Sequence, residues 1–194
     1  MGAWRLGFSF AFGRARGYAY LLQMDDDTFV YAPVADNLVA LMRDNGYLIA
    51  NRLHALNETR EVTAGLPELA AYFLATRGVE PAGPLFAHCV PPDARGLHTL
   101  VPGAPQPNGW DAQSLAGNFN IFDIAFWFSP PVQDFVQLVW ESRGCIEQRW
   151  NELGPQSMIR HLFVPDARFH TLTARIWHKK TRHFGVPFTR LARC

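Results

Sequence analysis

The sequence predicts an α/β domain, and three features support this fold class. Short apolar strands alternate along the chain with segments in which apolar residues recur at helical spacing. The apolar run 18–24 indicates a buried strand, and it ends abruptly at three aspartates. Proline and glycine mark helix boundaries, because Pro33 suits the first turn of a helix and Asn45-Gly46 suits its end.

The remaining elements follow the same alternation. Residues 47–50 indicate the next short strand, and a second helix is expected from Pro67 to Gly78. Residues 78–109 carry many prolines and little apolar periodicity, so we expect a long irregular excursion of the kind that often binds ligands. Further elements are expected as a strongly apolar segment at 117–128, a helix from Pro130 to Gly144, a helix at 157–164, and strand and loop at 168–178.

Composition limits the classes of function. The chain has 194 residues, of which 48% are hydrophobic and 18% charged, enough for one globular domain with a core. A net charge of +1 gives no electrostatic reason to expect nucleic acid or an anionic membrane as a partner. The apolar runs are too short to span a membrane, and the mixed residues that follow Met1 do not predict a signal peptide. The three cysteines lack the paired spacing of a zinc site.

The acidic run Asp25, Asp26 and Asp27 is the first candidate site. It follows an apolar strand, and open α/β sheets bind their ligands at the carboxyl edge. Hard carboxylate oxygens favour Mg²⁺ or Mn²⁺, which take their other ligands from a diphosphate. Alternate residues share a face, so Asp25 and Asp27 are expected to point together. A solvated acidic turn without function is the alternative interpretation.

Other candidates lie in the C-terminal half. Glu152 is expected on a loop after a helix, where it is either a functional carboxylate or ordinary solvated surface. His170 and His178 lie in an aromatic, basic segment, and a neutral histidine is a suitable Mn²⁺ ligand. The basic cluster Lys179, Lys180 and Arg182 could contact a diphosphate or form an exposed tail.

Three blocks of sequence resemble the fungal-type Golgi α-1,2-mannosyltransferases of glycosyltransferase family 15. Residues 18–27 resemble the family's Tyr-rich strand leading into Glu-Pro-Asp, with Asp25 and Asp27 at the two acidic positions. Residues 118–124 are similar to its Asn-Phe-Glu-Ile-Gly-Asp-Leu, and residues 148–157 to its Glu-Arg-Trp-Gly-Asp-Ala-Pro-Val-His-Ser. His178 falls near the histidine of the family's Gly-Tyr-Gln-His, which is a metal ligand there.

The resemblance implies a fold and an activity. It implies that residues 1–194 are a single, partial catalytic domain of the GT-A-like fold, with the N-terminal nucleotide-binding part shortened or missing. The implied reaction is metal-dependent transfer of mannose from GDP-mannose to a hydroxyl of a glycan or glycoprotein acceptor, with retention. The implied cofactor is Mn²⁺ or Mg²⁺ and the implied location is the Golgi lumen.

The resemblance also assigns roles to individual residues. Asp25, Asp27 and His178 would be metal ligands, and Glu152 would recognise the acceptor hydroxyl or act as a base. Asn120 would lie at the catalytic centre. The residues expected to contact the substrate are Tyr18, Tyr20, Asn118, Asp123 and Trp150, of which one tyrosine and Trp150 could instead be core.

Three positions depart from the family pattern. Asn120 stands where the family has a Glu that has been considered as a nucleophile, and an amide cannot form a glycosyl-enzyme. A front-face mechanism, in which the leaving diphosphate takes the acceptor proton, is then favoured. Glu152 replaces an Asp, and Gln156 replaces the His that precedes the family's Ser.

Two alternatives remain open. The acidic run also resembles that of inverting β-1,3-galactosyltransferases and Fringe-like proteins, which use UDP-sugars. A third possibility is a non-catalytic relative that binds a glycan or a partner chain. The amide of Asn120 in place of a carboxylate favours this third possibility.

Overall fold

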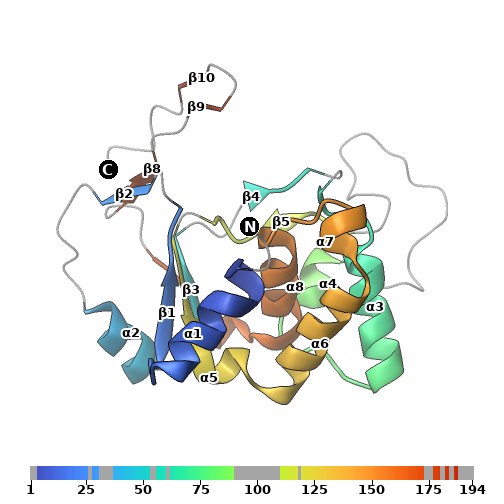
Figure 1. The fold of residues 1–194 in the computed structure, drawn as a ribbon, viewed down its shortest axis with the longest axis horizontal. Coiled ribbons are helices and arrows are strands. Elements are labelled where there is room, and N and C mark those ends of the chain that lie inside the picture. Colours follow the sequence, from blue (N-terminus) through green and yellow to red (C-terminus); the bar gives the residue numbers. More distant parts are fainter. Residues whose placement is uncertain are drawn as a thin grey trace.

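The computed structural model describes most of the chain (Figure 1). The described residues are 4–25, 28–30, 37–52, 56–59, 62–89, 110–117, 119–172, 177–179, 182–183 and 186–187. Three residues of the predicted site, Asp26, Asp27 and Asn118, lie outside them, as does most of the expected excursion at 78–109. His178 is described by its backbone alone.

A four-stranded mixed sheet organises the fold. Its strands, in spatial order, are β1 (Tyr20–Gln23), β6 (Asn120–Asp123), β3 (Ile49–Asn51) and β7 (Phe169–Thr171). β6 is antiparallel to both of its neighbours and β3 is parallel to β7. The strands β1, β3 and β7 therefore run in one direction, and their carboxyl ends share one edge of the sheet. The register places four residues in a row across that edge: Gln23, Asn120, Asn51 and Thr171.

Three two-stranded pairs accompany the sheet. They are β2 (Thr28–Val30) with β8 (Trp177–Lys179), β4 (Leu56–Asn57) with β5 (Gln113–Ser114), and β9 (Arg182–His183) with β10 (Val186–Pro187). In Figure 1 the β2–β8 pair lies beyond the carboxyl end of β1. The chain thus leaves β1, passes through the acidic run, and pairs at once with the C-terminal segment that contains His178.

Helices cover the sheet. They are η1 (Trp4–Phe8), α1 (Ser9–Ala15), α2 (Leu38–Asn45), α3 (Leu66–Arg77), α4 (Leu85–His88), α5 (Ile124–Trp127), α6 (Pro130–Glu141), α7 (Gly144–Glu147), α8 (Leu153–Phe163) and the short η4 (Asp166–Arg168). α2 begins where the Asn37 side chain accepts a hydrogen bond from the Ala40 amide (3.1 Å) and ends at Gly46, whose φ of 63° is left-handed. Figure 1 shows α1, α5, α6 and α8 on one side and α2 apart from them.

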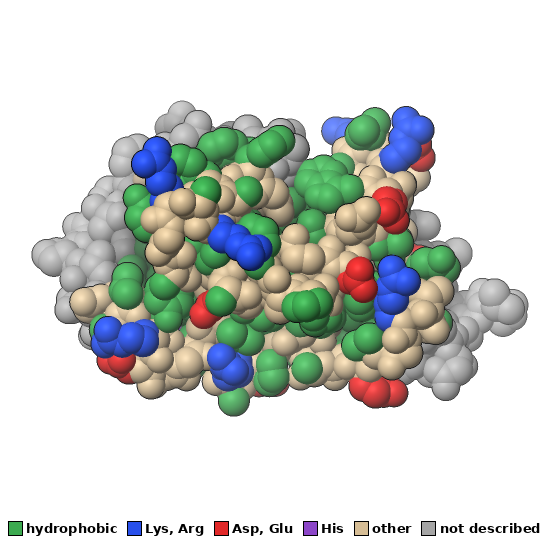
Figure 2. Space-filling model, turned by 60° about the horizontal axis from the view of Figure 1, so that its bottom comes forward, with side chains coloured by type: hydrophobic (Ala, Val, Ile, Leu, Met, Phe, Trp, Pro, Cys, Tyr) green, Lys and Arg blue, Asp and Glu red, His purple; other side chains and the backbone are tan. Residues whose placement is uncertain are grey.

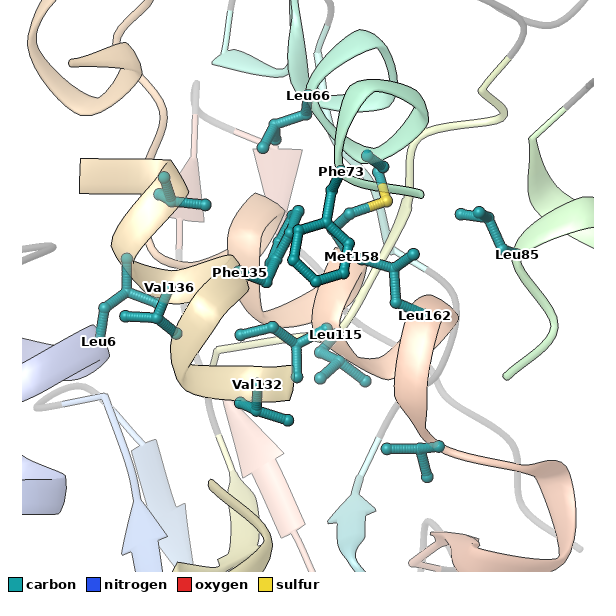
Figure 3. Packing of buried hydrophobic residues seen from close by; sticks show 14 of the residues in the cluster. Leu6, Leu66, Phe73, Leu85, Leu115, Val132, Phe135, Val136, Met158 and Leu162 are labelled. Carbon is teal, nitrogen blue, oxygen red and sulfur yellow. The ribbon is translucent and has the colours of Figure 1, made fainter. Parts of the chain in front are cut away.

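The buried apolar residues form two clusters, one on each face of the sheet. Adjacent residues of β3 divide between them: Ile49 belongs to the larger cluster and Ala50 to the smaller. In β6 the same division separates Phe122 from Ile121, as the alternation of a strand requires. Figure 3 shows the larger cluster, in which α3, α6 and α8 meet through Phe73, Phe135 and Met158.

The predicted α/β class is confirmed, and several elements match their expected positions. β1 lies within the expected strand 18–24, α3 begins beside Pro67 and ends at Gly78, and α6 begins at Pro130. Gly78 has a φ of 62°, the left-handed conformation that ends helices.

Two expected elements differ in their boundaries. The apolar segment 117–128 is strand for only four residues, because the Asp123 side chain accepts a hydrogen bond from the Phe126 amide (2.8 Å) and caps α5. The helix expected at 157–164 begins at Leu153, because Asn151 Oδ1 accepts hydrogen bonds from the Leu153 and Gly154 amides. Glu152 therefore lies at the N-terminus of α8 and not in an open loop.

The surface shows no accumulation of charge of one sign on the face in Figure 2, where basic and acidic side chains are scattered among apolar ones. Within the described part of the chain, no helix combines the length and apolar character needed to cross a bilayer.

Candidate functional site

Arg5 joins the two carboxylates that the sequence singled out, one from each half of the chain. Its Nη2 lies 2.8 Å from Asp25 Oδ1, and its Nη1 lies 3.3 Å from Glu152 Oε1. The same two nitrogens also donate to the carbonyl oxygens of Met24 (3.1 Å) and Gly117 (3.3 Å). The guanidinium therefore fixes the end of β1, the loop before β6 and the start of α8 around one point.

A buried glutamine pair holds the backbone of Arg5. Gln23 Nε2 and Gln156 Nε2 both donate to the Arg5 carbonyl, at 2.9 and 3.2 Å. Gln156 also donates to Gln23 Oε1 (2.9 Å), and Gln23 Nε2 lies 3.3 Å from Ser9 Oγ. Gln23 and Gln156 are only 5% and 0% exposed, so this buried hydrogen-bond network fixes the position of the Arg5 backbone.

Asn120 lies at the centre of the row across the sheet. Its Oδ1 accepts a short hydrogen bond from Asn51 Nδ2, which also donates to the Ala116 carbonyl at 3.0 Å. Asn120 is fully buried, and its own Nδ2 has no hydrogen-bond acceptor. In this conformation Asn120 lies below the surface, so contact with a sugar requires the residues above it to move.

Buried polar atoms without partners concentrate at this edge. Those at this edge are Arg52 Nε and Nη1, Asn120 Nδ2, Gln156 Oε1 and Thr28 Oγ1, and His161 Nδ1 on α8 is a further such atom among the described residues. Native proteins rarely leave such groups unpaired unless the site serves a ligand, an ion or water. The carboxyl edge of the sheet is therefore the best candidate for a binding site.

A further carboxylate, Glu58, belongs to the same neighbourhood. It follows β4, its amide donates to the Ala112 carbonyl (3.0 Å), and its side chain is hydrogen-bonded to Asn151. Burial raises the pKa of the Glu58 carboxyl, the Asn151 and Thr59 hydrogen bonds lower it, and the negative charge of Glu152 raises it slightly. A carboxyl group in such surroundings is suited to holding or accepting a proton.

The sequence did not single out Arg5, Asn51 or Glu58. Arg5 precedes Asp25 by twenty residues within an apolar helical segment, and nothing in that spacing indicates contact. Asn51 ends the short strand β3 and Glu58 follows the short strand β4, and only the fold reveals how these strands pair. Gln156 was noted only as a replacement of a family histidine, and its role in holding Arg5 is a structural finding.

Several predicted substrate-contacting residues lie away from this edge. Tyr20 pairs with Asp123 at the opposite end of β1, where Asp123 caps α5, and Tyr18 is exposed just before that strand. Trp150 is only 5% exposed, its Nε1 donates to the Ala64 carbonyl (2.6 Å), and its ring packs on Gly144. The structure therefore brings Asp25, Glu152 and Asn120 together and leaves these four elsewhere.

Of the expected metal ligands, the structure describes Asp25 and the backbone of His178, and Asp27 lies outside the described residues. Asp25 lies two residues beyond the end of β1, and β2 pairs with β8 so that Phe29 lies opposite His178. The backbone of His178 is thus placed beside the segment that follows the acidic run. Carboxylate oxygen with imidazole nitrogen is a donor set that suits Mn²⁺. The described residues contain no cluster of three or more His, Cys, Asp or Glu that could hold a metal.

A polar cavity of about 330 Å³ lies beside β7 and α8, and Thr171, the last residue of the row across the edge, is one of its lining residues. His88 Nδ1 contacts Asp111 Oδ2 at 2.8 Å, and its ring lies against His161. Burial, with a smaller effect of His88, lowers the pKa of His161 to about 3, so this histidine is neutral at physiological pH.

Comparisons with known proteins show the fold. No family model and no curated protein matches the sequence. Core-mannan synthase A (CmsA/Ktr4) from Aspergillus fumigatus, solved in an Mn/GDP form, matches with a TM-score of 0.75 at 17% identity over 92% of this chain. The mannosyltransferase Ktr4p from S. cerevisiae matches with a TM-score of 0.69 in complex with GDP and 0.71 in another structure, both at 18% identity over 86% and 89% of this chain.

The chain spans less than half of each of these proteins, namely 46%, 42% and 44% of their lengths. At such low identity the likeness concerns fold alone, and it agrees with the expected GT-A-like architecture. The chain thus shares the α/β fold of part of the Ktr4-type mannosyltransferases.

Proposed function

We propose that this chain is the sugar-transferring part of a GT-A-like glycosyltransferase that moves mannose from GDP-mannose to a glycan or glycoprotein hydroxyl, with retention. One observation carries the proposal: Asp25 and Glu152 both pair with Arg5 at the carboxyl edge of the sheet. The fold in which they do so is shared with GDP-bound mannosyltransferases. Residues 1–194 would form one partial catalytic domain, and the Golgi lumen remains the predicted location.

The position of Asp25 supports a proposed role for each residue, in which Asp27 and His178 are assigned from the family resemblance. Asp25, Asp27 and His178 would hold Mn²⁺ or Mg²⁺, which when bound neutralises charge on the leaving diphosphate. Arg5 keeps the Asp25 carboxylate at the end of β1, so that this ligand is ordered before any cation binds.

Glu152 is the proposed contact for the acceptor hydroxyl. Its side chain is 12% exposed and held by Arg5 at the start of α8, which restricts it to one position. Asn120 cannot serve as a nucleophile, so we propose that it orients the donor sugar or its surroundings while the leaving diphosphate takes the acceptor proton.

A non-catalytic glycan-binding protein is the second candidate. Complete burial of Asn120 favours it, because a fully covered amide does not contact a donor sugar directly. Such a protein would bind sugar without a nucleotide.

Calorimetric titration with GDP and UDP, each with and without Mn²⁺, separates these possibilities. We expect metal-dependent binding that prefers GDP, and at least a tenfold weaker affinity in Asp25→Asn. Asp44→Asn is the matched control, because Asp44 is exposed and paired with Arg43 far from the edge. A preference for UDP would favour the galactosyltransferase-like alternative, and absence of binding to both nucleotides by the folded chain would contradict the proposal.

A further inference from the structure

Arg52 lies at the carboxyl end of β3, one position beyond the row that contains Asn51. Its amide donates to the Phe119 carbonyl (3.2 Å), and the Leu172 amide donates to the Asn51 carbonyl (2.8 Å). The strand registers therefore continue for one residue and place Arg52 in a row with Met24, Phe119 and Leu172. Those three residues belong to the smaller apolar cluster, so a charged side chain is unexpected at this position.

The guanidinium of Arg52 is buried, and no acidic side chain of the described residues forms an ion pair with it. Arg52 is 6% exposed, and its Nε and Nη1 have no hydrogen-bond partner. Burial lowers the pKa of Arg52. Other buried arginines in the described part of the chain are paired: Arg5 with Asp25 and Glu152, and Arg160 with Asp166 at 2.6 Å.

An unpaired buried guanidinium is strongly unfavourable unless a ligand supplies the missing charge. Its planar fork of N–H groups matches an oxyanion, to which it can donate two parallel hydrogen bonds. We propose that Arg52 binds an oxyanion of the ligand that occupies the carboxyl edge of the sheet. The inference rests on the proposed function only in taking this edge as the ligand site.

Arg52 lies apart from the ion pairs that Arg5 forms with Asp25 and Glu152. Gln23, which leads to Asp25, bonds to the α1 and α8 side of the sheet, whereas the row of Arg52 belongs to the apolar cluster beside α2. Two strand spacings, about 10 Å, separate β1 from β3. A ligand lying across the edge would thus contact Asp25 with one group and Arg52 with another.

Two sources could supply the oxyanion, a phosphate of the nucleotide sugar or the carboxylate of an acidic sugar. The test uses inorganic pyrophosphate, GDP, guanosine and glucuronate as probes in calorimetric titration. Variants are Arg52→Met, which keeps the apolar stem, and Arg52→Lys, which keeps a charge without the fork. Arg77→Gln is the control, because Arg77 is exposed on α3.

We expect Arg52→Met to weaken the binding of pyrophosphate and GDP at least tenfold and to leave the affinity for guanosine unchanged. Arg52→Lys should recover part of the lost affinity. Tenfold weaker binding of glucuronate alone would support the same site with a carboxylate ligand. Equal affinity of the wild-type protein and Arg52→Met for every anion would overturn the inference. So would a wild-type chain that binds neither pyrophosphate nor glucuronate.

The unfolding midpoint in urea provides a readout that does not depend on ligands. If Arg52 awaits an external anion, Arg52→Met should unfold at the same or a higher urea concentration without ligand. A clearly lower midpoint would show that Arg52 pairs with an acid of its own chain, which contradicts the inference. If pyrophosphate binds through Arg52 while GDP does not bind at all, the proposed function fails and the oxyanion site stands.

Discussion

At the scale of the residue, Arg5 determines the geometry of the candidate site. Its guanidinium separates two carboxylates that would otherwise repel each other across a partly buried space. The Arg5 side chain is 12% exposed, so water compensates little for its removal. Arg5 thus both stabilises the fold and fixes the position of the Asp25 carboxylate.

We expect Arg5→Gln to lower the free energy of unfolding by about 3 kcal/mol, since it leaves two carboxylates without their cation. Urea unfolding followed by circular dichroism measures this loss. Arg143→Gln is the control, and its exposed pair with Glu147 should account for less than about 1 kcal/mol. If both variants lose the same stability, Arg5 does not have the proposed role.

At the scale of the element, the sequence predicted what depends on local pattern. The strand before Asp25 and the helices begun by Pro67 and Pro130 have clear periodicity and boundary residues, and they are found as expected. The division of residues 117–128 was not predictable from hydrophobicity, because a single hydrogen bond from Phe126 to Asp123 ends the strand.

The candidate site was predictable only where its residues lie in recognisable motifs. Asp25 and Glu152 were named from sequence because they belong to such motifs, and their meeting through Arg5 is a long-range contact. Arg52 and Asn51 gave no sequence signal, since their importance depends on burial and on the pairing of β3 with β6.

The packing of α7 near the start of α3, through the ring of Trp150, can be tested by mutation. A Cβ on Gly144 would overlap the ring of Trp150, which is anchored to the Ala64 carbonyl. We expect Gly144→Ala to cost about 2 kcal/mol in urea unfolding through overpacking. Gly7→Ala is the control, because a Cβ there meets nothing within 4 Å. Similar stability of both variants would mean that Trp150 is not held as described.

At the scale of the whole molecule, the candidate functional residues lie along one edge of the sheet. Asp25, Arg52 and the start of β6 at Asn120 all lie there, and the β2–β8 pair brings the backbone of His178 to the same end of the sheet. The shared fold with part of the Ktr4-type mannosyltransferases agrees with this arrangement but does not identify a substrate.

The most direct test of this arrangement is a crystal structure of the chain with Mn²⁺ and GDP, in which anomalous scattering locates the metal. The account predicts one Mn²⁺ ion held by Asp25, Asp27 and His178, close to the diphosphate of GDP. A metal and nucleotide bound away from Asp25, or a GDP complex whose diphosphate contacts neither the acidic run nor Arg52, would contradict it.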